Sequence, residues 1–200
     1  MKTNVTDALI VVDVQNCFLP GGSLGVEEGD RVIPVINRLM PLFEHMVYTR
    51  DWHPPDHVSF APESPEYRDL SWPPHCVQNT EGAEFSTALD LVPDALMVSK
   101  GDDPDREAYS GFQASGLDLT AELRDGGVER VFVTGLATDY CVRATALDAK
   151  RAGFEVVIVR DAVRGVAPET TKAALTELEQ EGIDSVNSEV IEPGNMVGSR

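Results

Sequence analysis

The sequence predicts one α/β domain of three layers, in which a mainly parallel, six-stranded sheet carries helices on both faces, as in Rossmann-like folds. Short apolar runs rich in β-branched residues alternate along the chain with segments of helical periodicity. These runs are continuously apolar, which is typical of parallel strands covered on both faces. A length of 200 residues with 42% hydrophobic residues is sufficient for one substantial core. We therefore expect a single domain over residues 1–200.

The first half of the chain contains three expected strands and one expected helix. Residues 8–12 read ALIVV and end at Asp13, which predicts a buried first strand. Residues 31–43 place apolar side chains at helical spacing after Asp30, the expected N-cap. Residues 46–49 and 95–99 are further apolar runs, and we expect them to be the second and third strands.

The second half repeats the alternation of strands and helices. Residues 117–124 and 168–180 are expected to be helices, because each has helical spacing and is followed by glycine. A third helix follows Gly135, where Val142, Ala146 and Ala149 repeat at the spacing of one buried face. The expected strands of this half are residues 131–133, 155–160 and 185–187, and residues 192–200 are expected to be a loosely ordered tail.

The charge balance excludes two classes of partner. The formal net charge is −18. Nucleic acids and anionic membranes both attract basic patches, so we expect neither as a partner. No apolar run approaches the length of about 18 residues that a membrane span needs. An acidic surface with few lysines suits a high-salt cytoplasm; an ordinary acidic protein is the alternative.

Cysteine usage indicates a reducing compartment. Cys17, Cys76 and Cys141 form an odd and sparse set, which argues against a disulfide framework. The first residues lead into a strand rather than a signal peptide, so we expect a cytoplasmic location. Cys76 is interpreted as a packing residue. Cys17 lacks a helix-start environment and is a weaker nucleophile candidate than Cys141.

A long proline-rich region spans residues 53–86. Loops of this length are usually disordered or functional. The aromatic residues within it argue for packing, and whether it moves as a lid stays open.

Four expected strands end at residues with useful chemistry, namely Asp13, Asp51, Lys100 and Cys141. Ligands of parallel α/β sheets bind outside the carboxyl ends of the strands. A single polar residue after a strand is ordinary, but four together favour an active site at this edge.

Asp13, Lys100 and Cys141 form a candidate catalytic set. Cys141 falls in the first turn of an expected helix, where free backbone N–H groups and the helix dipole stabilise a thiolate. Asp13 is expected to carry the thiol proton, and Lys100 to hold Asp13 and lower the thiol pKa. The structural alternatives are a buried hydrophobic cysteine, a loop-capping carboxylate and a surface lysine.

Asp51, His53 and His75 form a candidate metal site. One carboxylate and two imidazoles suit zinc, manganese or iron. His57 is a fourth candidate ligand, and the alternative is a set of surface histidines. Phe18 and Trp72 lie on the same loops as these two candidate sets. We expect them either to sandwich the flat ring of a ligand or to pack in the core.

Five motifs together resemble the nicotinamidases of the isochorismatase-like hydrolase superfamily. They are DVQNCF at 13–18, RDWHPPDH at 50–57, WPPHC at 72–76, KG at 100–101 and GLATDYCV at 135–142. The resemblance extends from about residue 8 to residue 191, with the motifs in the family's order.

The resemblance implies a thioester mechanism of NAD salvage. Cys141 would attack the carboxamide of nicotinamide, with Asp13 as general base and then acid and Lys100 completing the triad. The backbone N–H groups of Ala137 and Cys141 would form the oxyanion hole, next to a cis peptide at Leu136–Ala137. The metal on Asp51, His53 and His75 would bind the pyridine nitrogen, with zinc favoured over iron or manganese; His57 is a ligand in only some members. Phe18 and Trp72 would pack on the ring, and pyrazinamide would also be hydrolysed.

Two alternatives remain at this stage. One is another amidohydrolase of the superfamily that acts on a carbamoyl or ureido substrate, since such relatives share the cysteine region but generally lack the D-x-H motif. The other is a non-catalytic metal-binding protein on the same fold. Whether the chain forms a homo-oligomer is open.

Overall fold

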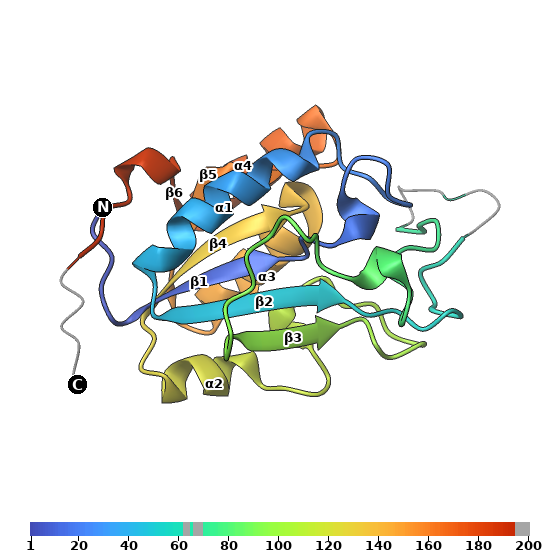
Figure 1. Cartoon of the computed structure of the whole chain (residues 1–200), viewed down its shortest axis with the longest axis horizontal. Coiled ribbons are helices and arrows are strands. Elements are labelled where there is room, and N and C mark those ends of the chain that lie inside the picture. The colour runs from blue at the N-terminus through green and yellow to red at the C-terminus, as the bar shows by residue number, and fades with distance from the viewer. Residues whose placement is uncertain (62–64, 66–69, 195–200) are drawn as a thin grey trace.

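The computed structural model describes residues 1–61, 65 and 70–194. Six strands form one sheet in the order β3-β2-β1-β4-β5-β6, and every neighbouring pair is parallel (Figure 1). The predicted fold class is therefore confirmed. The strands are β1 (Asp7–Val12), β2 (His45–Asp51), β3 (Leu96–Lys100), β4 (Arg130–Leu136), β5 (Glu155–Arg164) and β6 (Asp184–Val186).

Successive side chains along a strand point to opposite faces of the sheet, and they build two cores, one on each face. On β1, Leu9 and Val11 belong to the core that includes the buried face of α1, whereas Ala8, Ile10 and Val12 belong to the opposite core. The second core also contains buried side chains of α2, α3 and α4. Both faces are covered, which explains the continuously apolar strands. The helices are α1 (Val32–Leu39), α2 (Leu119–Asp125), α3 (Arg143–Arg151) and α4 (Pro168–Gln180).

Several predicted elements differ in extent from the structure, and two of these differences have a visible cause. The helix expected over residues 31–43 is an α-helix only from Val32 to Leu39, and a 3-10 turn follows at Met40–Leu42. Pro41 lies in that turn and has no N–H to continue the α-helical hydrogen bonds. Strand β5 does not end at Asp161 but continues to Arg164. Asp161 instead accepts hydrogen bonds from the backbone N–H and hydroxyl of Ser188.

The long loop between β2 and β3 packs along much of its course. Trp72 is 3% exposed, and isolated parallel bridges join His53 to Val77 and Phe60 to Trp72. Residues 62–64 and 66–69 lie outside the described residues. The described part of the expected tail pairs with the N-terminus, because Thr3 N–H donates to Glu192 O at 3.0 Å; residues 195–200 again lie outside.

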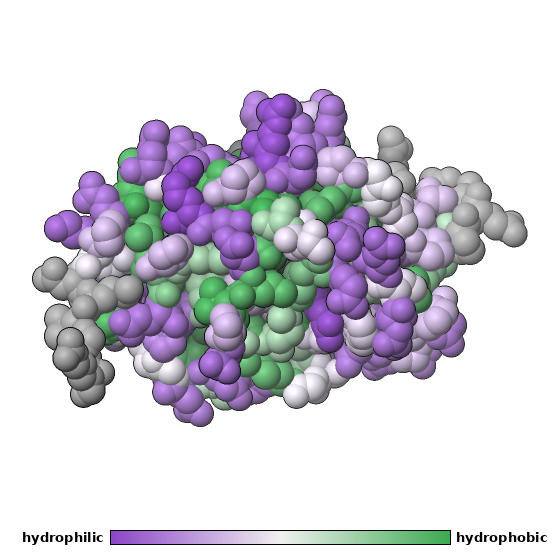
Figure 2. Space-filling view, viewed as in Figure 1, coloured by the Kyte–Doolittle hydropathy of each residue, from purple (hydrophilic) through white to green (hydrophobic). Residues whose placement is uncertain are grey.

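The face shown in Figure 2 is largely hydrophilic, with hydrophobic side chains gathered over β2, β3 and the segment before β3. Exposed Leu91, Val92 and Met97 belong to that segment and to β3. Among the described residues, no helix has the length and apolar character needed to cross a membrane.

Candidate active site

The carboxyl ends of β1, β2, β3 and β4 bring the predicted site residues together. Asp13 follows β1, and the register of β2 with β3 places Asp51 directly beside Lys100. Cys141 lies in the turn after β4, the strand that pairs with β1 on its other side. Parallel pairing therefore gathers four side chains that are distant in the sequence.

Lys100 contacts both other members of the candidate catalytic set. Its ammonium lies 2.9 Å from Asp13 Oδ2 and 3.3 Å from Cys141 Sγ. A carboxylate oxygen of Asp13 lies within 4.8 Å of the sulfur. Asp13 and Lys100 are fully buried and Cys141 is 6% exposed. The arrangement places a thiol, a proton acceptor and a cation in one water-poor space.

Electrostatics in this space keep the thiol protonated. Burial raises the pKa of Cys141 well above its ordinary value; Lys100 opposes this shift, and the carboxylates of Asp13 and Asp51 add to it. Lys100 lowers the thiol pKa, as expected, but burial outweighs its effect, and the net shift is upward. Burial also raises the pKa of Asp13, against the effect of Lys100. The raised pKa of Asp13 makes this carboxylate a better proton acceptor, and the raised pKa of Cys141 keeps the proton on the sulfur until the sulfur attacks.

Lys100 keeps its charge despite complete burial. Burial lowers the pKa of Lys100, but Asp13 and Asp51 outweigh that effect and hold the pKa well above its ordinary value. A permanent ammonium between two carboxylates makes their joint burial tolerable.

Cys141 lies in a π-helical turn rather than in the first turn of an ordinary α-helix. The turn covers Thr138–Val142, and α3 begins directly after it. Val142 N–H donates to Ala137 O at 3.1 Å, and the Leu136–Ala137 peptide is cis, as the resemblance implies. Single π-turns occur frequently at functional sites.

Asp51, His53 and His75 present ligand atoms to one point. The Nε2 atoms of His53 and His75 lie 3.5 Å and 3.8 Å from Asp51 Oδ2. Each Nδ1 faces a backbone carbonyl oxygen at 2.8 Å, Gly101 O for His53 and Pro73 O for His75. A carbonyl only accepts, so Nδ1 carries the proton and the Nε2 lone pair is free to bind a metal. The donor set therefore fits a divalent metal ion.

Protonation of the two imidazoles is unequal. Burial lowers the pKa of His75 to about 4, so this ring is neutral near pH 7. Burial also opposes protonation of His53, but Asp51 outweighs it and raises the pKa of His53. A glycine is required beside this ring, because a Cβ at Gly101 would lie 2.6 Å from His53 Nδ1.

Asp51 joins the catalytic set to the metal-ligand group. Its Oδ1 accepts a hydrogen bond from Lys100, while its Oδ2 faces the histidines. Burial acts against ionisation, yet Lys100 and His53 hold the pKa of Asp51 below its ordinary value. The two sets that the sequence suggested separately are one connected array.

His57 lies beside this array, with both ring nitrogens facing protein atoms. Nδ1 is 2.8 Å from Ser59 Oγ and Nε2 is 3.2 Å from Arg106 O. Ligand atoms of His57, His53 and Glu107 also come within 4.8 Å of one another. The group centred on Asp51 does not include His57.

A pocket connects Cys141 with the histidines. Its lining includes the predicted ring-packing residues Phe18 and Trp72 and the predicted oxyanion residues Ala137 and Cys141. The other lining residues that matter here are Asp51, His53, His75, Tyr109 and Val166. Trp72 Nε1 donates to the hydroxyl of Tyr109 at 3.0 Å. Burial raises the pKa of Tyr109 above its ordinary value, so its phenol stays neutral near pH 7. Apolar rings and a few polar atoms suit a flat, neutral ligand.

Comparison with known proteins identifies the family. Residues 7–190 match the model of the isochorismatase domain. The chain belongs to the isochorismatase family.

Several relatives in this family are similar over nearly their whole length. The nicotinamidase/pyrazinamidase of Mycobacterium tuberculosis is 42% identical over 189 residues, which cover 90% of this chain and 98% of that protein. The structure of Pyrococcus horikoshii pyrazinamidase in complex with zinc is 51% identical with a TM-score of 0.81, covering 91% of this chain and 99% of the other. The crystal structure of L. infantum PnC1 in complex with nicotinate is 35% identical with a TM-score of 0.86. The match covers 96% of this chain and 99% of the other.

Sequence reasoning missed three polar residues of this isochorismatase-family site. The hydroxyl of Thr49 donates to Asp13 Oδ1 at 2.6 Å. The Gln15 side chain accepts from the backbone N–H of Asp51 and donates to its carbonyl oxygen, each at 2.8 Å. Tyr109 lines the pocket. Thr49 and Tyr109 are single polar residues outside the quoted motifs, and Gln15 lies within DVQNCF but its amide carries no signal of which backbone groups it binds.

The expectation about the cysteines requires correction. Cys17 and Cys76 form a disulfide across 59 residues, and Cys141 is the free thiol among the three cysteines. Cys17 is therefore no nucleophile, and Cys76 packs in the core as expected but is also part of a cross-link. Their chain neighbours Phe18 and His75 stack at 5.5 Å between ring centroids. The disulfide thus joins two loops that line the pocket.

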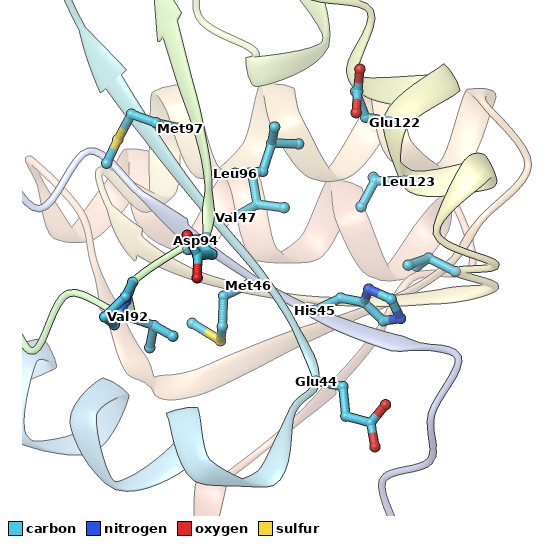
Figure 3. A pocket seen from close by; sticks show the side chains of 13 residues that line it. Glu44, His45, Met46, Val47, Val92, Asp94, Leu96, Met97, Glu122 and Leu123 are labelled. Atoms are coloured by element: carbon cyan, nitrogen blue, oxygen red, sulfur yellow. The ribbon is translucent and has the colours of Figure 1, made fainter. Parts of the chain in front are cut away.

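A larger cleft lies away from this site, where β2 begins. It has a volume of about 470 Å³ and is lined by the N-terminal ends of β2 and β3 and by α2 (Figure 3). Glu44, Asp94 and Glu122 are its carboxylates. Its His45 has Nε2 3.1 Å from Val5 O, and within the described residues no metal-capable cluster falls in this cleft. Size alone therefore does not identify the family's active site here.

Proposed function

We propose that the chain is a nicotinamidase, which hydrolyses nicotinamide to nicotinate and ammonia in NAD salvage. The observation that carries this proposal is a single pocket lined by Cys141 together with Asp51, His53 and His75. Lys100 contacts both Cys141 and Asp13 beside this pocket. The candidate catalytic set suits attack on an amide carbon, and the candidate metal site suits capture of a pyridine nitrogen through a metal. The relatives named as nicotinamidases and the nicotinate complex support the same substrate class.

In this proposal, Asp13 accepts the thiol proton as Cys141 Sγ attacks the carboxamide carbon. The backbone N–H groups of Ala137 and Cys141 stabilise the oxyanion. Asp13 then donates the proton to the nitrogen, ammonia leaves, and a nicotinoyl thioester remains. Asp13 next takes a proton from water as the water attacks the thioester carbon, and the C–S bond breaks. Asp13 returns this proton to the leaving Cys141 sulfur, and nicotinate is released after its carboxyl group loses a proton to solvent. Lys100 remains an ammonium throughout and stabilises the charge on Asp13.

Asp51, His53 and His75 would hold one divalent metal, which when bound supplies a Lewis-acid contact to the ring nitrogen. We propose zinc, because two imidazoles and a carboxylate suit it and the similar pyrazinamidase is named as a zinc complex. Phe18 and Trp72 would pack on the ring. Pyrazinamide carries the same carboxamide and should also be a substrate.

Three further proposals concern the setting of the enzyme. The free thiol of Cys141 must stay reduced to react, which favours a cytoplasmic location, where the buried Cys17–Cys76 disulfide would be an exception. Residues 1–200 would act as one catalytic domain. The partner would be a small molecule rather than a nucleic acid or membrane, as the charge of −18 indicates.

Ammonia release from nicotinamide tests the proposal. Cys141→Ala should abolish turnover. His53→Ala should lower turnover by about 100-fold or more and reduce the metal content, because it removes one ligand. His45→Ala is the matched control, since His45 lies in the distant cleft.

Two outcomes would redirect the assignment. Full turnover in Cys141→Ala would end the proposal. Turnover of a carbamoyl or ureido substrate, without nicotinamide turnover and without bound metal, would favour the other amidohydrolase class. No turnover of either substrate would favour a non-catalytic role.

A further inference from the structure

Asp139 stands two residues before Cys141, in the same π-helical turn, and its side chain binds a different element. It is 8% exposed. Val166 N–H donates to Asp139 Oδ1 at 3.0 Å, and Ala167 N–H donates to Oδ2 at 3.3 Å. The hydroxyl of Thr170 also donates to Oδ2. The carboxylate therefore holds the segment that leads from β5 into α4.

The start of α4 lacks a side-chain cap from its own sequence. Ala167 is at the N-cap position with no capping hydrogen bond, and Pro168 follows it. A carboxylate at a helix N-terminus is stabilised by the helix dipole. Asp139 provides this negative charge from another part of the chain, so α4 and the nucleophile turn are fastened to each other.

Gly165 allows the two segments to approach closely. A Cβ at this position would lie 1.8 Å from Thr171 Oγ1 and 3.1 Å from Asp139 Oδ1. Val166, the next residue, lines the pocket together with Cys141. The hydrogen bonds of Asp139 therefore connect the backbone that carries the sulfur with one wall of the pocket.

We propose that Asp139 is a positioning residue that sets the place of Cys141 relative to the Val166 wall. It acts through the backbone at both ends, and it does not line the pocket among the described residues. This inference rests on the proposed amide hydrolysis for its kinetic readout. It assigns to Asp139 a role beyond the stability of α4.

A second link to α4, made from α3 rather than from the π-helical turn, offers a matched control. Arg143 of α3 and Glu177 of α4 form an ion pair at 2.6 Å between Nη2 and Oε1. Glu177→Gln weakens the joint between α3 and α4 without touching the π-helical turn. Asp139→Asn keeps the size of the side chain, but its amide nitrogen cannot accept the hydrogen bonds that one of the carboxylate oxygens accepts. Asp139→Ala removes the contact completely.

The test compares kcat, KM and the reactivity of Cys141 in these variants, each first shown to be folded by circular dichroism. We expect kcat for nicotinamide to fall about tenfold in Asp139→Asn and further in Asp139→Ala, since small misplacements of reacting groups have large effects on rate. Glu177→Gln should keep kcat within about twofold of the wild type. Alkylation of Cys141 by iodoacetamide should slow in the Asp139 variants at every pH between 6 and 9.

Two results would overturn the inference. The first is that folded Asp139→Asn and Glu177→Gln have the same kcat and the same rate of Cys141 alkylation. The other is a loss of thermal stability with no change in either rate, which would assign Asp139 to α4 alone. If the wild type does not hydrolyse nicotinamide, the proposed function fails, but the alkylation rates still decide the role of Asp139.

Discussion

Asp13 illustrates how the surroundings of one residue set its chemistry. Burial raises its pKa, whereas Lys100 and the hydroxyl of Thr49 lower it. The mechanism requires Asp13 as a carboxylate before attack, so activity is present above this pKa and is lost as the pH falls through it. The acid limb of the kcat/KM profile should therefore lie above the ordinary pKa of an aspartate, which is 3.8.

Thr49→Val should move this limb to higher pH. The substitution removes the donor to Asp13 Oδ1, which favours the charged form, so the pKa of Asp13 rises. The measurement is kcat/KM for nicotinamide against pH. Thr134→Val is the control, because the buried hydroxyl of Thr134 donates to Ile10 O at 3.0 Å, outside the site. An acid limb in Thr49→Val identical to that of Thr134→Val would contradict this account of Asp13.

At the scale of elements, the site depends on strand ends and on the loops that cover them. The strand ends provide Asp51 and Lys100 in register, and the π-helical turn after β4 provides Cys141. The covering loops are joined by Cys17–Cys76, whose residues are each 1% exposed. The cross-link closes a loop of 59 residues and limits the freedom of the unfolded chain.

Removal of this cross-link should lower the stability of the folded protein. Cys17→Ser with Cys76→Ser should reduce the free energy of unfolding by about 4 kcal/mol, following the loop-closure relation. Urea unfolding with and without a reductant measures the effect, and the wild type under reduction should resemble the double variant. Thiol titration of the unfolded, unreduced wild type should find Cys141 alone. Three titratable thiols would contradict the cross-link.

At the scale of the whole molecule, the sequence predicted the layers but not every connection. The alternation of apolar runs and helical spacing predicts a parallel sheet, and a parallel sheet brings Asp13, Lys100 and Cys141 to one edge. The net direction of the pKa of Cys141 could not be predicted, because burial depends on the packing of elements distant in sequence. The pairing of Cys17 with Cys76 was missed for the same reason, since spacing alone does not define disulfide connectivity.

The net charge leads to a prediction for the molecule as a whole. A charge of −18 should cause self-repulsion that salt screens, because the Debye length falls to about 3 Å at 1 M salt. If the surface is suited to high salt, molar potassium chloride should stabilise the fold by about 2 kcal/mol, which raises Tm by about 4–8 °C. Thermal unfolding in a potassium chloride series measures this, and a Tm that does not rise would reject the high-salt hypothesis.

The central claim is that one pocket presents a cysteine nucleophile and a metal-held ring site to the same small molecule. The most direct test is a crystal structure of Cys141→Ala with zinc and nicotinamide. We predict zinc on Asp51, His53 and His75, the pyridine nitrogen on the metal, and the carboxamide carbon facing position 141 beside Asp13. Nicotinamide bound in the larger cleft, or zinc bound away from Asp51, would contradict the claim.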